Sequence, residues 1–91
     1  MKIDTLIYIN NMLVAEKEAR ENALKYTMDL LDQRYAELEE QGITWRTPNE
    51  KLKKDGIEGN LLVLREIRTT QKQKLDEAES ALEDFKNHDF K

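Results

Sequence analysis

The sequence contains no cysteine, one proline and only three glycines among its 91 residues. Without cysteine the chain can form no disulfide framework, no thiolate metal site and no cysteine nucleophile. So few chain breakers disfavour a fold of many short strands and turns, and they favour long helices. The hydrophobic fraction of 38% is below the average for globular domains, as expected for helices with wide solvated faces. The composition predicts one all-α domain over residues 1–91.

Residues with catalytic chemistry are scarce as well. His88 is the only histidine and has Asp84 one helical turn before it and Asp89 beside it. A lone histidine near the end of a helix is more often solvated than catalytic. The sequence offers no evident general base that could activate Ser80. It also contains no Glu-x-x-His motif of the kind that holds two metal ions in a helical bundle. We therefore expect no enzyme activity, no cofactor, no metal and no small-molecule substrate.

Long apolar runs are missing too. The apolar stretch from Ile3 to Val14 contains Asp4 and two asparagines and is too short to span a bilayer. It also lacks the basic start and the small-residue cleavage site of a signal peptide. We expect a soluble, cytoplasmic chain without a membrane span.

A first long helix is predicted over residues 5–41. Asp4 is a suitable N-cap, no glycine or proline occurs from Thr5 to Gln41, and Gly42 is a natural C-terminal stop. A helix of this length extends over roughly 55 Å.

A second helix is predicted over residues 48–87, after a turn at 42–47. Thr47-Pro48-Asn49-Glu50 has the pattern of a capping box, with Thr at the N-cap, Pro at the first helical position and Glu at the third. A short turn makes the two helices antiparallel neighbours. Two glycines in a helix interior cost about 2 kcal/mol together, so a kink or break near Gly56–Gly59 stays open. The same glycines match the Gly-x-x-Gly loop of nucleic-acid-binding KH domains only in spacing, because the strands of that fold are missing.

The apolar residues of the second helix alternate at intervals of four and three, as in a coiled coil. A similar seam in the first helix runs from Leu24 to Leu38. Together they predict a long antiparallel, coiled-coil-like hairpin. The seam of the second helix consists of Ile57, Leu61, Leu64, Arg68, Gln71, Leu75, Ala78, Leu82 and Phe85.

The register of the hairpin is predicted from its turn. If Gln41 faces Pro48, the numbers of facing residues add up to 89, and the polar stretch 16–22 faces the polar stretch 67–73. We expect a polar layer at mid-hairpin that sets this register more than it adds stability. Its members are Arg20, Arg68 and Gln71.

Two regions carry more apolar residues than a two-helix hairpin can cover. The stretch 3–14 and the run 61–64 are apolar all round the helix, and exposed patches of that kind mark association sites. We expect a second interface, most simply a homodimer of two hairpins that forms a four-helix bundle, with Ala15, Ala19 and Ala23 allowing close approach. Helix propensity alone would also explain these alanines. The predicted interface residues are Ile3, Leu6, Ile7, Ile9, Met12, Leu13, Leu61, Leu62, Leu64, Leu75, Leu82 and Phe85.

A small basic cluster surrounds the only tryptophan at the turn. An aromatic side chain among cations can contact an acidic partner or nucleic acid. Alternatively, Trp45 caps the end of the hairpin core and the lysines are solvated. With a net charge of −4 and a pI of about 5.0, nucleic-acid binding is not expected. The candidate contact residues are Trp45, Arg46, Lys53 and Lys54.

The architecture resembles the small helical-hairpin substrates and adaptors of type VII secretion. The likeness rests on the size, the acidic composition without cysteine, the two antiparallel helices and the tryptophan in the turn. The turn motif of that family is Trp-x-Gly, whereas this chain has Trp45-Arg46-Thr47, and its Tyr-x-x-x-Asp/Glu tail corresponds only to Phe85-Lys86-Asn87-His88-Asp89. The resemblance implies an adaptor-like function and covers architecture rather than sequence.

These features favour a non-catalytic protein–protein interaction module that binds itself or a helical partner. An alternative is a small inhibitor or regulator, encoded by a phage or mobile element, that docks an acidic helical face onto a nucleic-acid enzyme. A further alternative is the secretion-type adaptor.

Overall fold

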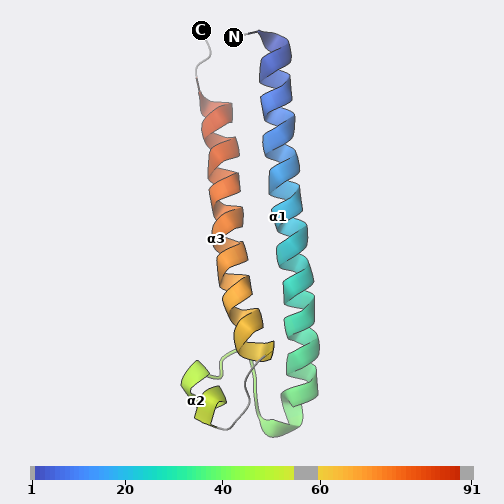
Figure 1. Ribbon diagram of the computed structural model, residues 1–91, viewed down its shortest axis with the longest axis vertical. Helices are drawn as coiled ribbons and strands as arrows, with labels where there is room; N and C mark the ends of the chain where they lie inside the picture. Colours follow the sequence, from blue (N-terminus) through green and yellow to red (C-terminus); the bar gives the residue numbers. More distant parts are fainter. Residues whose placement is uncertain (1, 55–59, 89–91) are drawn as a thin grey trace.

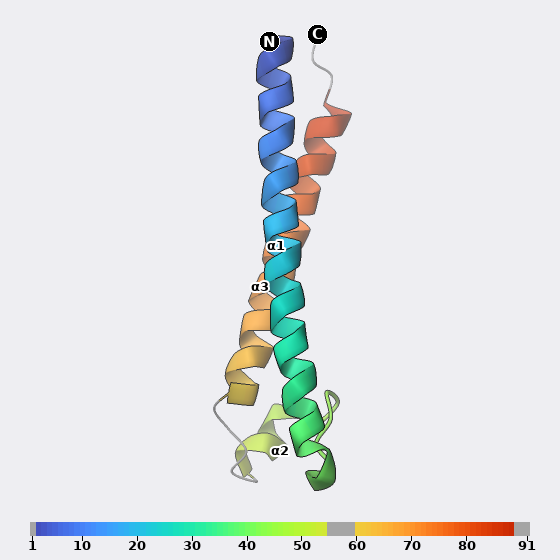
Figure 2. The ribbon, with the colours of Figure 1, turned by 90° about the vertical axis from the view of Figure 1, so that its right-hand side faces the viewer.

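The computed structural model describes residues 2–54 and 60–88, with Lys54 and Asn60 described by their backbone alone. Its elements are α1 (Ile3–Leu38), the 3-10 turn η1 (Glu39–Gln41), α2 (Asn49–Lys54) and α3 (Asn60–Asn87). Helices α1 and α3 lie side by side and antiparallel, in a molecule of 59 × 20 × 16 Å (Figure 1; Figure 2). The described part of the chain contains no strand, which confirms the predicted all-α hairpin.

Helix α1 begins two residues earlier than predicted. Lys2 has an extended backbone (φ −72°, ψ 146°), and its carbonyl accepts the N–H of Leu6 at 3.1 Å. Asp4 lies in the first turn, where its charge suits the helix dipole, so its assignment as N-cap is wrong. The lack of glycine and proline then allows 36 helical residues, about 54 Å.

Gly42 ends this helical segment as predicted. It has a left-handed backbone with φ of 73°, which residues with a Cβ adopt at a cost. Its N–H donates to the carbonyl of Glu39 at 2.9 Å, and the N–H of Ile43 donates to the carbonyl of Leu38 at 3.4 Å. The chain therefore leaves α1 through a tightened last turn in which the carbonyls of Leu38 and Glu39 are satisfied.

The predicted capping box at Thr47 is wrong. The Thr47 hydroxyl accepts the N–H of Thr44 at 2.9 Å, so it stabilises the turn before α2. The carbonyl of Pro48 instead accepts the first helical N–H groups, from Lys51 at 3.1 Å and Leu52 at 3.2 Å. Helix α2 consequently starts at Asn49, one residue later than predicted.

Residues 48–87 do not form one helix. Helix α2 lies beside the closed end of the hairpin, and its axis differs from that of α3 in both views (Figure 1; Figure 2). The predicted break near Gly56–Gly59 falls on residues outside those described. The connection between α1 and α3 is therefore longer than a simple turn, and it includes a helix of six residues.

The core at the closed end is made by all three helices and the turn. Leu52 of α2 and Leu61 of α3 have no exposed surface and pack with Ile43 of the turn. Within the run 61–64, Leu61 is therefore covered by the chain itself and Leu62 and Leu64 pack against the same cluster, whereas Val63 stays 52% exposed. The buried cluster consists of Leu31, Leu38, Ile43, Leu52 and Leu61.

Toward the open end of the hairpin, the core is a single seam between α1 and α3. Leu75, Ala78 and Leu82 of α3 are buried, and Phe85 is half-buried. These positions keep the predicted spacing of three and four residues, which places them on one face of α3.

The register differs from the prediction by about three turns. Tyr35 of α1 accepts a hydrogen bond from Nε of Arg65 at 2.9 Å, and Leu24 lines a common hollow with Leu75. The numbers of facing residues thus add up to about 100 instead of 89. The extra residues of α2 and its flanking segments cause this shift, because they lengthen the connection between the long helices.

The predicted polar layer is wrong for the same reason. Arg20 bonds to Glu16 within α1, with 2.6 Å between Nη2 and Oε1. Arg68 instead lines a hollow with Met28, in this register about 18 Å from Arg20 along α1. Gln71 lies one turn after Arg68, and among the described residues its buried Oε1 has no hydrogen-bond partner.

Candidate functional site: a closed-end hollow and an exposed stripe

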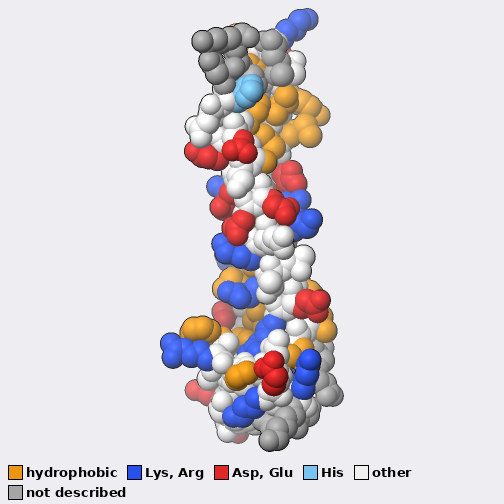
Figure 3. Space-filling model, turned by 90° about the vertical axis from the view of Figure 1, so that its left-hand side faces the viewer, with side chains coloured by type: hydrophobic (Ala, Val, Ile, Leu, Met, Phe, Trp, Pro, Cys, Tyr) orange, Lys and Arg blue, Asp and Glu red, His pale blue; other side chains and the backbone are white. Residues whose placement is uncertain are grey.

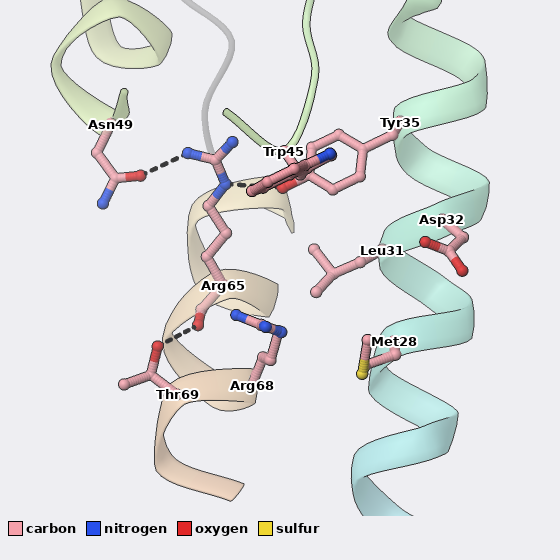
Figure 4. Close-up of a pocket in the computed structure, with 9 residues that line it drawn as sticks. All are labelled: Met28, Leu31, Asp32, Tyr35, Trp45, Asn49, Arg65, Arg68 and Thr69. Carbon is pink, nitrogen blue, oxygen red and sulfur yellow. Dashed lines mark hydrogen bonds between the residues drawn. The ribbon is translucent and has the colours of Figure 1, made fainter. Parts of the chain in front are cut away.

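A hollow of about 460 Å³ opens between α1 and α3 at the closed end of the hairpin (Figure 4). We call it the closed-end hollow. Its apolar wall comes from α1 and from the turn, α3 contributes two arginines, and α1 also contributes the carboxylate of Asp32. The main lining residues are Met28, Leu31, Tyr35, Trp45, Arg65 and Arg68.

Arg65 joins α3 to α1, to the turn and to α2. Its Nε donates to the Tyr35 hydroxyl at 2.9 Å. Its Nη1 donates to the carbonyl of Thr47 at 2.6 Å and to Oδ1 of Asn49 at 2.8 Å, and its Nη2 donates to the carbonyl of Thr44 at 3.1 Å. The guanidinium also lies 5.6 Å from the centre of the Tyr35 ring. Four hydrogen bonds therefore fix this cation at the edge of the hollow.

Within the described part of the chain, no carboxylate forms an ion pair with the two arginines of the hollow. All four acceptors of Arg65 are uncharged oxygens. The ion pairs between described residues are all local pairs inside α1 or α3, and none includes Arg65 or Arg68. Figure 4 shows the Arg68 guanidinium projecting from α3 toward Leu31 and Met28 of α1. Two positive charges thus line one partly apolar hollow.

Trp45 lies on the rim of this hollow and is 69% exposed. The guanidinium of Arg46 stacks 4.9 Å from the centre of its ring. The alternative that Trp45 caps the hairpin core is therefore wrong, because Ile43 and Leu52 fill that position. Lys53, on α2, is also exposed. The side chain of Lys54 is outside the described structure.

A second surface results from the register. Helix α1 extends past the end of α3, so residues 3–11 have no facing residue on that helix (Figure 1). Figure 3 shows hydrophobic side chains gathered near this open end. Of the predicted interface residues here, Leu6, Ile9 and Leu13 are half-buried. More than half of the side-chain surface is exposed at Ile3, Ile7, Tyr8 and Met12.

An uncharged stripe continues from this region along α1. Its members follow one another at intervals of four and three residues, the spacing of a coiled-coil seam. All of them are exposed, in contrast to the seam that packs on α3. We call this surface the Tyr–Ala stripe, and it consists of Tyr8, Met12, Ala15, Ala19, Asn22 and Tyr26.

The basic cluster and part of the stripe were predictable from the sequence, whereas other residues of these surfaces were not predicted. The pairing of Arg65 with Tyr35 had no sequence signal, since it depends on the register. The role of Tyr26 did have one, because Tyr26 follows Ala19 and Met12 at intervals of seven residues. The stripe was therefore detectable as a second seam on the same helix.

Within 2–54 and 60–88, no group of three His, Asp or Glu side chains is arranged to hold a metal ion. No helix in the same ranges is long and apolar enough to cross a membrane.

Comparison with known proteins gives no family assignment. No protein-family model, no curated protein and no solved structure matches the chain. The arguments for function therefore rest on the two surfaces described above.

Proposed function

We propose that the protein is a non-catalytic interaction module that pairs with a second copy through the Tyr–Ala stripe. The observation that carries this proposal is an exposed seam with coiled-coil spacing and no charged residue, on a helix whose other seam already packs on α3. A helix face that served only solvation would carry charges at these positions. Two hairpins joined in this way form a four-helix bundle.

The order of residues in the stripe favours an antiparallel, two-fold arrangement. The stripe has large residues at both ends and alanines in the middle. When two such helices run antiparallel, Ala15 of one copy faces Ala19 of the other and Tyr8 faces Tyr26. The backbones approach most closely at the alanines, and the helices diverge where the tyrosines need room. Each tyrosine can then bury its ring and keep its hydroxyl in water.

The energetics also support association. Burial of a large apolar side chain contributes about 1.5–3 kcal/mol, and the stripe offers both tyrosines and a methionine from each copy. Met12 and the two tyrosines are each more than half exposed in the single chain. This surface is large enough to offset part of the entropy that is lost on association.

Sedimentation equilibrium of the full chain tests the proposal. The wild type should sediment as a dimer at tens of micromolar, whereas Ala19→Glu should shift the equilibrium to monomer by more than tenfold, because it places a carboxylate in the close contact. Ala36→Glu is the matched control, since Ala36 is an exposed alanine of α1 outside the stripe. A monomeric wild type, or equal dimerisation by Ala19→Glu and the control, would show the proposal to be wrong.

Disulfide crosslinking can test whether the two copies pair antiparallel, because the chain has no cysteine of its own and only introduced cysteines can react. In an antiparallel dimer, a mixture of Ala15→Cys and Ala19→Cys chains should form mixed disulfide dimers under mild oxidation. Each variant alone should crosslink poorly, since identical positions lie too far apart for a disulfide. Efficient crosslinking of Ala15→Cys to itself would indicate a parallel dimer instead.

A further inference from the structure

The closed-end hollow combines features that the proposed dimer does not use. It has two guanidinium groups that form no ion pair with a described residue, an apolar wall and an exposed indole at its rim, and Asp32 is the one carboxylate in its lining. We propose that it binds a short acidic peptide segment of a partner protein, in which a carboxylate lies next to an apolar side chain.

Arg68 is the group that would bind the carboxylate. Its guanidinium projects across the hollow toward α1 (Figure 4), and no described residue forms a hydrogen bond or ion pair with it. A guanidinium can hold a carboxylate through two parallel hydrogen bonds, which are stronger than bonds between neutral groups. Arg68 is thus the donor available to a ligand in this hollow.

Arg65 would act by its position and charge. Its four hydrogen bonds hold the guanidinium in place before a ligand arrives, so binding loses little side-chain entropy there. Because its acceptors are uncharged, its positive charge remains to attract an anion. Arg65 therefore preorganises the positive field, while Arg68 contacts the ligand.

The apolar wall explains why a bare anion is not the expected ligand. Met28 and Leu31 form the wall on α1, and the indole of Trp45 stands at the rim. Met28 is 41% exposed, and its burial under an aliphatic or aromatic side chain would be favourable. A peptide residue of that kind beside the carboxylate would fill the hollow, whereas a small inorganic ion would leave the wall in water.

Charge distribution favours a short acidic segment over a nucleic acid. Arg46, Lys51 and Lys53 are exposed on the segment that borders the hollow and extend its positive field. Residues 1–44, which include α1 and the turn beside the hollow, carry nine acidic and five basic side chains, and Asp32 lies in the lining itself. A long polyanion would run onto these negative charges, but a segment of a few residues would not.

The single tryptophan makes the site easy to observe. The probe is the capped hexapeptide Glu-Asp-Leu-Phe-Asp-Glu, titrated into the full chain while the fluorescence of Trp45 is recorded. We expect a saturable change at submillimolar peptide that weakens with added salt, because charge pairs at an exposed site are screened. The uncharged analogue, with Gln and Asn in place of Glu and Asp, should give no saturable change. A short single-stranded oligonucleotide and inorganic phosphate should bind more weakly than the acidic peptide.

Arg68→Gln and Lys74→Gln form the decisive pair of variants. Both remove one positive charge from an exposed position of α3, but only Arg68 lines the hollow. Arg68→Gln should weaken peptide binding by about tenfold to a hundredfold, the usual contribution of hydrogen bonds to a charged group. Lys74→Gln should change it less than twofold. Circular dichroism of each variant confirms that the fold is kept.

Several results would overturn the proposal. They are the absence of a saturable response to the acidic peptide, equal binding of its uncharged analogue, equal effects of the two variants, or tighter binding of the oligonucleotide. The closed-end hollow and the Tyr–Ala stripe share no residue. Arg68→Gln should therefore leave the sedimentation of the protein unchanged, so failure of the peptide site and failure of the dimer can be told apart.

Discussion

At the scale of single residues, Arg65 shows how one side chain can organise an end of a thin molecule. The turn exposes carbonyl groups that accept no hydrogen bond from a helix. Arg65 donates hydrogen bonds to two of them, the carbonyls of Thr44 and Thr47. The same guanidinium reaches Asn49 at the start of α2 and Tyr35 on α1. Because its planar donors point in several fixed directions, no other side chain type can replace all four contacts.

We predict that Arg65→Gln lowers the free energy of unfolding by about 2–3 kcal/mol, because several polar groups lose their partner. Arg65→Lys should restore only part of this loss, since one ammonium group cannot reach all four oxygens. Urea unfolding followed by circular dichroism measures the effect. Arg68→Gln is the control and should stay within about 0.5 kcal/mol of the wild type. Equal stability of the Arg65 and Arg68 variants would contradict the assigned role.

At the scale of elements, α2 is a helix that the rest of the protein holds in place. Six residues are too few for a helix to be stable by itself in water. Leu52 supplies the missing stabilisation, because it is fully buried against Ile43 and Leu61. Through this contact α2 closes the end of the hairpin, where one of the two sequence-based interpretations placed Trp45.

Leu52→Ala should therefore destabilise the protein by about 2–4 kcal/mol, through lost burial and the cavity left behind. Hydrogen exchange should show the amides of α2 losing protection first, while the amides around Leu75 and Leu82 stay protected. Lys53→Ala, at the exposed neighbouring position, should change little. Uniform loss of protection along the whole hairpin would indicate that α2 does not unfold separately.

At the scale of the whole molecule, the protein is a rod with one narrow seam for most of its length. Each long helix can hide only one face in such a seam, so any further apolar face stays exposed. The overhang of α1 adds to this surface at the open end, and the closed-end hollow adds a charged site at the other. The two ends thus offer different chemistry, apolar at one and cationic at the other.

The register can be measured with pairs of spin labels on introduced cysteines. Labels at 25 and 74 should show strong dipolar coupling, because facing residue numbers add up to about 100 in the structure. Labels at 20 and 69, which the hairpin with a simple turn would place opposite each other, should couple much more weakly. They are offset by about three helical turns, roughly 16 Å along the axis. Stronger coupling between labels at 20 and 69 than between labels at 25 and 74 would instead support the register predicted from the sequence.

The sequence by itself determined that the chain is helical and that its first helical segment ends at Gly42. A 36-residue helix follows from the lack of breakers between Ile3 and Leu38, and its end follows from Gly42, whose backbone conformation favours glycine. It also determined that apolar residues exceed what one seam can cover, since spacing alone reveals stripes on a helix. These features are local, and local sequence therefore suffices to predict them.

Only the tertiary structure decided the register, the closed-end hollow and the cover of Leu61. A shift of eleven residues is close to three full turns, so it keeps the same helix face toward the partner and leaves the apolar pattern matched. Periodicity therefore could not distinguish the two alignments. The choice came from the packing of Leu52 with Ile43 and Leu61, which folds α2 across the end and places Arg65 beside Tyr35.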